Sequence, residues 1–231
     1  MLKTNYSFHA VADRKGFVLG AMVTPGNTYD SQTLEPLVEK VIKKIGKPQA
    51  VAADGAYKTP AITSYLIEND RTPALPYTRP RTKEGFFRKH EYGYDEHFDC
   101  YLWPEGEVLA YSTTNKEGYR EYKSSKEVCA VCPSLAKCTE SKDHQKVVTR
   151  HIWQEYVEEA DPLRHHEEGK PIYVKRQETI ERVFADAKEK HGMRWTNLRG
   201  LKKLSMQAML TFAAMNLKKM ANWTWQGPKM V

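Results

Sequence analysis

The sequence lacks any apolar run long enough to cross a membrane, and its 231 residues include only four cysteines. A membrane-spanning helix needs about 20 consecutive apolar residues, so no transmembrane segment is expected. The first residues, MLKTNYSFHAVADRKG, lack a basic segment followed by an apolar one, which argues against a secretory signal peptide. The predicted location is therefore the cytoplasm, where cysteines favour metal binding or free thiols over disulfides.

Acidic residues are absent after Glu189, whereas eight Lys or Arg residues lie between Lys190 and Val231. The net charge is +7, so the rest of the chain is close to neutral. A basic block at one end is typical of a protein that binds a polyanion, most often nucleic acid. A solvated helix face rich in lysine is the alternative explanation.

The first third of the chain predicts alternating strands and helices. The turn DRKG, ending in Gly16, separates two partly alternating segments and indicates a β-hairpin. The expected elements are, in order, a hairpin (5–12 and 17–24), a helix that Asp30 and Ser31 cap and that runs to Gly46, a buried strand (49–53), and a second helix with Thr59 as its N-cap. This order predicts an α/β core with a mixed sheet and flanking helices.

From about Tyr77 the chain becomes rich in Pro, Arg, Lys, Gly and Tyr, without a sustained helical period. We predict an insertion of irregular and short β structure over residues 77–170, between two parts of the core at 1–76 and 171–231. The last segment, LKKLSMQAMLTFAAMNLKKMANW, is apolar on so many sides that we expect it to pack deep in the core.

The segment ETIERVFADAKEKHGMRW, residues 178–195, predicts a helix with one apolar face. That face consists of residues at positions i, i+3, i+4 and i+7, namely Ile180, Val183, Phe184 and Ala187. Glu181 and Lys188 lie within about 20° of each other on one edge of it. Glu181 is then either a salt-bridge residue at the rim of the core or a carboxylate held rigidly beside a cleft.

Asp54 follows the predicted strand and precedes Gly55. Ligands in open α/β sheets bind beyond the carboxyl ends of strands, although an Asp there can also simply cap the following turn. A carboxylate at a strand end and another on a helix edge suit a hard divalent cation such as magnesium. Such ions support phosphoryl transfer.

Several segments of the chain resemble bacterial insertion-sequence transposases of the DDE class, which have a ribonuclease-H-like catalytic domain. The similarity covers most of the chain and is carried by VTPGNTYDSQTL, VAADGAYKTP, the cysteine-containing stretches FDCYLWPEGEVL and EVCAVCPSLAKCTES, and the C-terminal block from YVKRQETIERVF to NLKKMA. The resemblance implies that Asp54 and Glu181 are the second and third acids of the catalytic triad. It also implies Mg²⁺ or Mn²⁺ as cofactor, DNA as substrate, a location at the nucleoid, and a homodimer or an assembly with full-length transposase.

Many members of this family carry a Tyr–Arg–Glu–Lys signature with two, three and six residues between its members. In this chain Tyr173 and Arg176 keep the first spacing, and Glu181 and Lys188 keep the last, but four residues separate Arg176 from Glu181. The resemblance implies that Tyr173, Arg176 and Lys188 contact the DNA backbone near the scissile phosphate. Further DNA-binding candidates come from the basic block: Arg194, Arg199, Lys202 and Lys203.

The first acid of the triad has no counterpart, because in the family it lies on a strand before the hairpin. Asp13 lies in the hairpin turn and Asp30 at a helix start. We therefore expect a transposase truncated at its N-terminus and inactive alone, or a degenerate remnant that binds DNA or interferes with full-length transposase. The edge of a hairpin without that strand is uncovered and open to pairing with another chain.

The spacing of Cys129, Cys132 and Cys138 suggests structural zinc, with Cys100 or His144 as a fourth ligand. A loop-rich insertion with reduced thiols is the alternative, and a zinc-dependent nuclease is a further one.

Overall fold

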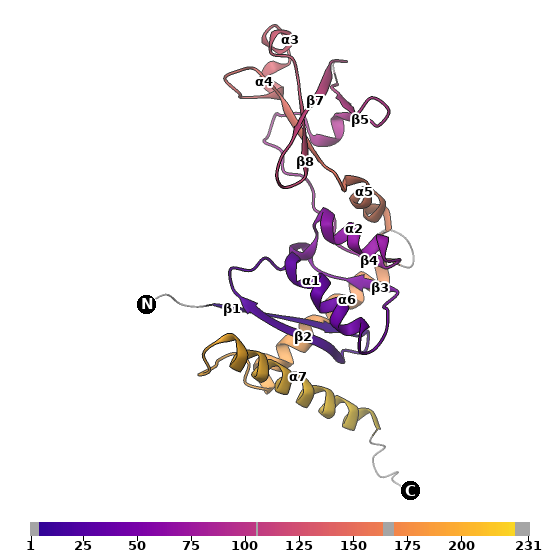
Figure 1. Cartoon of the computed structure of the whole chain (residues 1–231), viewed down its shortest axis with the longest axis vertical. Helices are drawn as coiled ribbons and strands as arrows, with labels where there is room; N and C mark the ends of the chain where they lie inside the picture. Colours follow the sequence, from indigo (N-terminus) through magenta and orange to yellow (C-terminus); the bar gives the residue numbers. More distant parts are fainter. Residues whose placement is uncertain (1–4, 105, 164–168, 225–231) are drawn as a thin grey trace. The chain divides into compact units, whose positions relative to one another are not determined.

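The computed structural model describes residues 5–104, 106–163 and 169–224. The chain forms two compact units (Figure 1). Unit 1 comprises residues 1–77 and 156–231, and unit 2 comprises residues 78–155. No helix in the described ranges combines the length and apolar character needed to cross a membrane.

Unit 1 begins with the predicted β-hairpin. Strand β1 (Tyr6–Ala12) pairs antiparallel with β2 (Val18–Pro25), with a register shift between Val11 and Ala12. Gly16 adopts a φ of +80° in the connecting turn, a conformation that side chains with a Cβ rarely adopt. The prediction of a hairpin is confirmed.

Helix α1 (Ser31–Ile42) covers one face of the hairpin and buries Leu34, Leu37, Val38 and Val41. The expected capping by the Asp30 side chain is wrong. Asp30 has helical backbone angles and makes no side-chain capping bond. Its carbonyl instead accepts a hydrogen bond from the Thr33 hydroxyl at 2.7 Å.

A second, parallel pair of strands follows, formed by β3 (Ala50–Ala52) and β4 (Thr72–Ala74). Between them lie the short 3₁₀ turn η1 (Gly55–Tyr57) and helix α2 (Pro60–Glu68). The Ile62 amide donates to the Thr59 hydroxyl at 3.3 Å, so Thr59 is the predicted N-cap. Strand β3 is half-buried, whereas the sequence predicted a fully buried strand. The reason is that β4 is its one neighbour among the described strands.

The C-terminal part of unit 1 consists of helices α5 (Gln154–Leu163, which begins in unit 2), α6 (Gly169–Lys190) and α7 (Leu201–Thr224). The helix predicted over residues 178–195 therefore starts earlier and ends at Lys190. Gly192, with a φ of +71°, and a hydrogen bond from the Met193 amide to the Ala187 carbonyl mark its end.

Helix α7 packs on β2 through Leu204, Ala208 and Phe212. The expectation that it packs deep is wrong, because its other sides expose Met206, Met209, Leu210, Leu217 and Trp223. Its buried residues join Val18, Val23, Val183 and Ala187 in the core cluster shared by the hairpin, α6 and α7.

Unit 2 contains a five-stranded antiparallel sheet and is more regular than the sequence suggested. Its strands follow one another in sequence order: β5 (Gly93–Asp95), β6 (Cys100–Leu102), β7 (Val108–Thr114), β8 (Tyr119–Lys123) and β9 (Val147–His151). The short elements η2 (Lys89–Glu91), α3 (Lys126–Ala130) and α4 (Leu135–Cys138) complete it. Its core is rich in aromatic residues and includes Tyr92, Tyr101, Trp103, Leu109 and Tyr122.

Candidate active site beside strand β3

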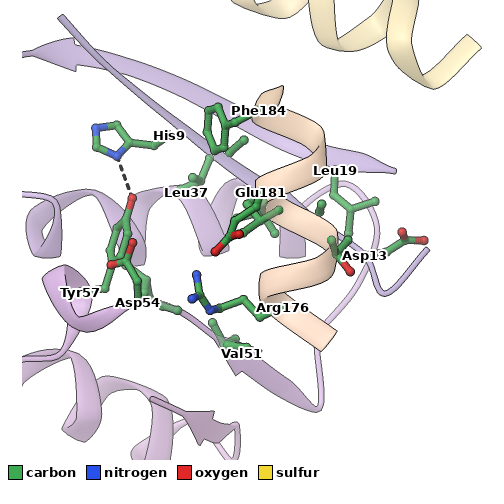
Figure 2. A pocket seen from close by; sticks show the side chains of 18 of the residues that line it. His9, Asp13, Leu19, Leu37, Val51, Asp54, Tyr57, Arg176, Glu181 and Phe184 are labelled. Carbon is green, nitrogen blue, oxygen red and sulfur yellow. Dashed lines mark hydrogen bonds between the residues drawn. The ribbon is translucent and has the colours of Figure 1, made fainter. Parts of the chain in front are cut away.

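A cavity of about 1450 Å³ lies within unit 1, lined by β1, α1, β3 and α6 (Figure 2). Both predicted acids, Asp54 and Glu181, are among its lining residues, although 126 positions of sequence separate them. Lys175, Arg176 and Lys188 line the same cavity. The fold therefore brings the carboxylates and the basic residues of α6 to one place.

Asp54 is exposed and lies directly beyond the carboxyl end of β3. One of its oxygens, Oδ1, accepts a hydrogen bond from the Ala56 amide at 3.0 Å and thereby caps η1. The turn-capping role is thus present. The other oxygen, Oδ2, has no hydrogen-bond or ion-pair partner among the described residues, so the cap leaves it available for a ligand.

Glu181 is held by the predicted apolar face of α6. Val183 and Ala187 are buried, and Ile180 and Phe184 pack partly buried against the same cluster, which confirms that face. Glu181 and Lys188 are exposed at its edge, on the cavity side. Ion pairs along α6 join Lys175 to Glu178 and Lys190 to Asp186, and none in the described part of the helix involves Glu181. The rim salt bridge is therefore not formed here.

The Arg176 guanidinium points into the cavity, toward the side where Asp54 and Glu181 lie (Figure 2). Its Nε is buried and has no hydrogen-bond partner among the described residues. The guanidinium also lies 5.2 Å from the centre of the Tyr173 ring, and this ring is outside the cavity lining. Tyr173 thus orients Arg176 and does not itself face the cavity.

A group that sequence analysis missed lies beside Asp54. His9 Nδ1 is 2.9 Å from the Tyr57 hydroxyl and 3.9 Å from an Asp30 oxygen, while its Nε2 is 2.9 Å from the Thr24 hydroxyl. Burial lowers the pKa of His9, against the opposing effect of Asp30. Burial and the negative charges of Asp30 and Asp54 raise the pKa of Tyr57 to about 12. A single His in a strand carries no motif, so only the fold shows this group.

The other predicted DNA-binding residues lie outside the cavity lining. Arg194 pairs with Glu189, which does line it, and Arg199 is exposed on the connection between α6 and α7. Lys202 and Lys203 are exposed in the first turn of α7.

The four cysteines divide into two places within unit 2. Cys132 and Cys138 belong to the aromatic core of unit 2, and the Cys132 amide donates to the Cys129 carbonyl, whereas Cys100 begins β6. Cys129 donates to the Ser124 hydroxyl at 3.1 Å, and Cys138 lies 3.6 Å from the Tyr92 hydroxyl. Among the described residues, no group of three or more His, Cys, Asp or Glu side chains is arranged to hold a metal ion.

Asp54 and Glu181, two of the five acidic residues that line the cavity, lie there with the cationic side chains of α6, and this combination is suited to phosphate and hard cations. Comparison with protein families agrees with such a site, because residues 102–221 match a transposase DDE domain. This match covers more than half of the chain, so the chain belongs to the DDE transposase family. Such enzymes act on DNA and generally use divalent metal ions. Searches among curated proteins and among solved structures gave no match.

Proposed function

We propose that the chain is a catalytic-domain portion of a DNA transposase, with a ribonuclease-H-like core and an insertion around unit 2. The observation that carries this proposal is the shared cavity of Asp54 and Glu181 beside Arg176 and Lys188. The matched family segment includes Glu181, Arg176 and Lys188 and supports their assignment.

The residues at the cavity fit a hard divalent cation, Mg²⁺ or Mn²⁺. Asp54 offers Oδ2 while its Oδ1 stays in the turn, and Glu181 is exposed without an ion-pair partner among the described residues. These two side chains would hold the ion. When bound, it would polarise a phosphate oxygen and favour attack by a hydroxyl group.

The basic residues of α6 would bind the DNA backbone. Arg176 points into the cavity with an unpaired Nε, and a phosphate oxygen would satisfy that donor. Lys188 lies two helical turns beyond Glu181 on the same side and would bind a neighbouring phosphate. Arg194, Arg199, Lys202 and Lys203 would extend the contact along the duplex.

Metal binding can be tested by replacing Mg²⁺ with Fe²⁺ and mapping the backbone cuts that the bound iron produces. We expect cuts near residues 54 and 181, suppressed by excess Mg²⁺, because Fe²⁺ occupies oxygen-rich sites of similar size. Glu181→Gln should abolish them, whereas Glu35→Gln, an exposed residue of α1 outside the cavity lining, should not. Cuts that persist in Glu181→Gln would contradict the assignment.

Asp54 needs a control that separates its structural role from metal binding. Asp54→Asn keeps an acceptor for the Ala56 amide, whereas Asp54→Ala removes it, at a cost of about 1 kcal/mol. We expect Asp54→Asn to retain stability and lose the iron-dependent cuts. Equal loss of stability in both variants would show that the charge itself supports the fold.

We further propose that this chain alone is inactive in strand cleavage and joining, because the two assigned carboxylates, Asp54 and Glu181, hold the ions less well than three would. The second candidate function is DNA binding without catalysis, as in a degenerate transposase. It is favoured by the exposed Arg199, Lys202 and Lys203. In that case duplex binding would weaken steeply with salt and would be unchanged by Glu181→Gln.

Structural zinc at the cysteines, a homodimer or an assembly with full-length transposase, and association with the nucleoid also remain predictions. The backbone contact between Cys129 and Cys132 and the shared core of Cys132 and Cys138 support three zinc thiolates, once Cys129 and Cys138 leave their present hydrogen bonds. Metal analysis of the purified protein, before and after thiol oxidation, tests the zinc prediction.

A further inference from the structure

Helix α7 carries a second apolar stripe on the side that faces away from the hairpin. Figure 1 shows α7 as an outer layer of unit 1 beside β2, the strand on which its buried residues pack. At about 100° per residue, the second stripe occupies about 80° of the helix surface, opposite the buried one. It consists of five exposed residues: Met206, Leu210, Ala213, Leu217 and Met220.

The spacing of this outer stripe is that of a helix pair. Its members follow one another at intervals of four, three, four and three residues, which is the heptad spacing of the seam between two packed helices. Lys218 and Lys219 point away from the seam. The positions that flank the seam carry no charge: Gln207, Met209, Ala214, Asn216 and Ala221.

The surface that matches this seam is the same helix of a second copy. A continuous apolar patch on a folded surface marks an interaction site, and a heptad seam selects a helix with the same spacing. Leu210 is 67% exposed and Leu217 is 62% exposed. Each of the other described helices exposes at most one large apolar side chain, so none of them offers a comparable seam.

The charges of α7 determine the orientation of such a pair. Lys202 and Lys203 are exposed in its first turn, and α7 contains no acidic residue. Parallel packing would bring four lysines together at the positive ends of two helix dipoles. Antiparallel packing separates them to opposite ends of the pair, where they stay available for the DNA contact proposed above.

An antiparallel pair centred on Ala213 also matches side chains of similar size. Leu210 of one copy then faces Leu217 of the other, and Met206 faces Met220. The small side chain of Ala213 permits a close approach of the two backbones at the centre. Since α7 is already formed on the hairpin, association requires no folding of the helix, which lowers its entropic cost.

We propose that two copies of the chain associate through this outer stripe of α7, packed antiparallel about a twofold axis near Ala213. The inference assigns a surface to the homodimer that the proposed function includes. It requires neither metal nor DNA, and it leaves the cavity of Asp54 and Glu181 free.

Sedimentation equilibrium of the whole chain, without metal or DNA, measures the association. We expect the mass to rise from 26.7 kDa to twice that value between about 1 and 100 µM, as for a small interface. Leu210→Glu should weaken association about tenfold or more, because it places a charge in the seam. The matched control is Asn222→Glu, which adds the same charge at an exposed position outside the seam and should dimerise as the wild type does.

Mixed variants test the orientation. Leu210→Lys mixed with Leu217→Glu should form heterodimers, because antiparallel packing brings the two charges together. Leu210→Lys mixed with Leu210→Glu should form fewer. Circular dichroism should show an intact fold in each variant, since both leucines are exposed in the monomer. Glu181→Gln should dimerise as the wild type does, so failure of the metal assignment and failure of this interface give separate results.

Three outcomes would overturn the proposal. A chain that stays monomeric at 100 µM would assign the stripe to a different protein. Equal association of Leu210→Glu and the wild type would place the interface elsewhere on the chain. Preferential pairing of Leu210→Lys with Leu210→Glu would show parallel packing.

Discussion

At the scale of single residues, His9 links the hairpin to the environment of Asp54. It is almost fully buried, yet both ring nitrogens have partners, one from β2 and one from η1. Tyr57, which it contacts through Nδ1, lies three residues after Asp54. His9 therefore positions the turn that carries the acid and is a positioning residue, since it does not itself occupy the carboxylate side of the site.

The lowered pKa of His9 predicts a pH dependence of stability. The folded state favours the neutral ring, so the unfolded chain binds more protons and folding weakens as pH falls through the ordinary value of 6.5. Above that value the contribution is fully present. Urea unfolding between pH 5 and 7.5 should show a smaller loss of stability on acidification in His9→Gln than in the wild type.

The comparison with His9→Gln is needed because burial also lowers the pKa of His151, in unit 2, which acts in the same direction. An unchanged pH dependence in His9→Gln would show that His9 is not the titrating group. A destabilised His9→Gln at pH 7.5 is expected as well, because Gln cannot reach both the Thr24 and Tyr57 hydroxyls.

At the scale of elements, the attachment of α7 to the hairpin depends on one side chain. Asn216 accepts a hydrogen bond from the Val18 amide at 2.9 Å and donates one to the Val18 carbonyl at 2.8 Å. It thus satisfies both backbone groups of the residue at which β2 begins, where the hairpin register shifts. The contact supplements the apolar packing of Leu204, Ala208 and Phe212.

Asn216→Ala should therefore lower the free energy of unfolding by about 2 kcal/mol, since two hydrogen bonds of about 1 kcal/mol each are lost. Asn222→Ala, at an exposed position of the same helix, is the matched control for the gain in helix propensity. Chemical denaturation of both variants measures the difference. Similar stability of the two would mean that water replaces Asn216 at Val18.

An element could be predicted from sequence where its pattern lies within a short stretch of neighbouring residues. The hairpin and the apolar face of α6 were predicted correctly because alternation and i, i+3, i+4 spacing are properties of neighbouring residues. The burial of α7 was not, since its total apolar content does not tell which side meets β2. Met206, Met209 and Leu210 contributed to the prediction but are exposed.

At the scale of the whole molecule, the candidate site needed information that no local pattern holds. The strand end and the helix edge identified Asp54 and Glu181, and the fold then placed both on one cavity. His9 was missed because its partner Tyr57 is 48 positions away. The sheet of unit 2 was underpredicted because three of its strands are too short to show a periodic pattern. β5 and β6 have three residues each, and β8 adjoins a turn rich in Gly and Lys.

The two units have separate cores, and this predicts separate effects of core mutations. Leu109, in unit 2, and Leu204, in unit 1, are each at most 2% exposed. Replacing either by Ala removes buried methyl groups and leaves a cavity, at a cost of about 2–5 kcal/mol. Because no residue belongs to both core clusters, that cost should remain within the unit that carries the change.

Hydrogen exchange resolved by peptide should show loss of protection over residues 78–155 in Leu109→Ala, and over β1, β2, α6 and α7 in Leu204→Ala. If each variant instead lowers protection equally in both units, the chain unfolds as one cooperative body, and unit 2 contributes directly to the stability of the part that holds Asp54 and Glu181.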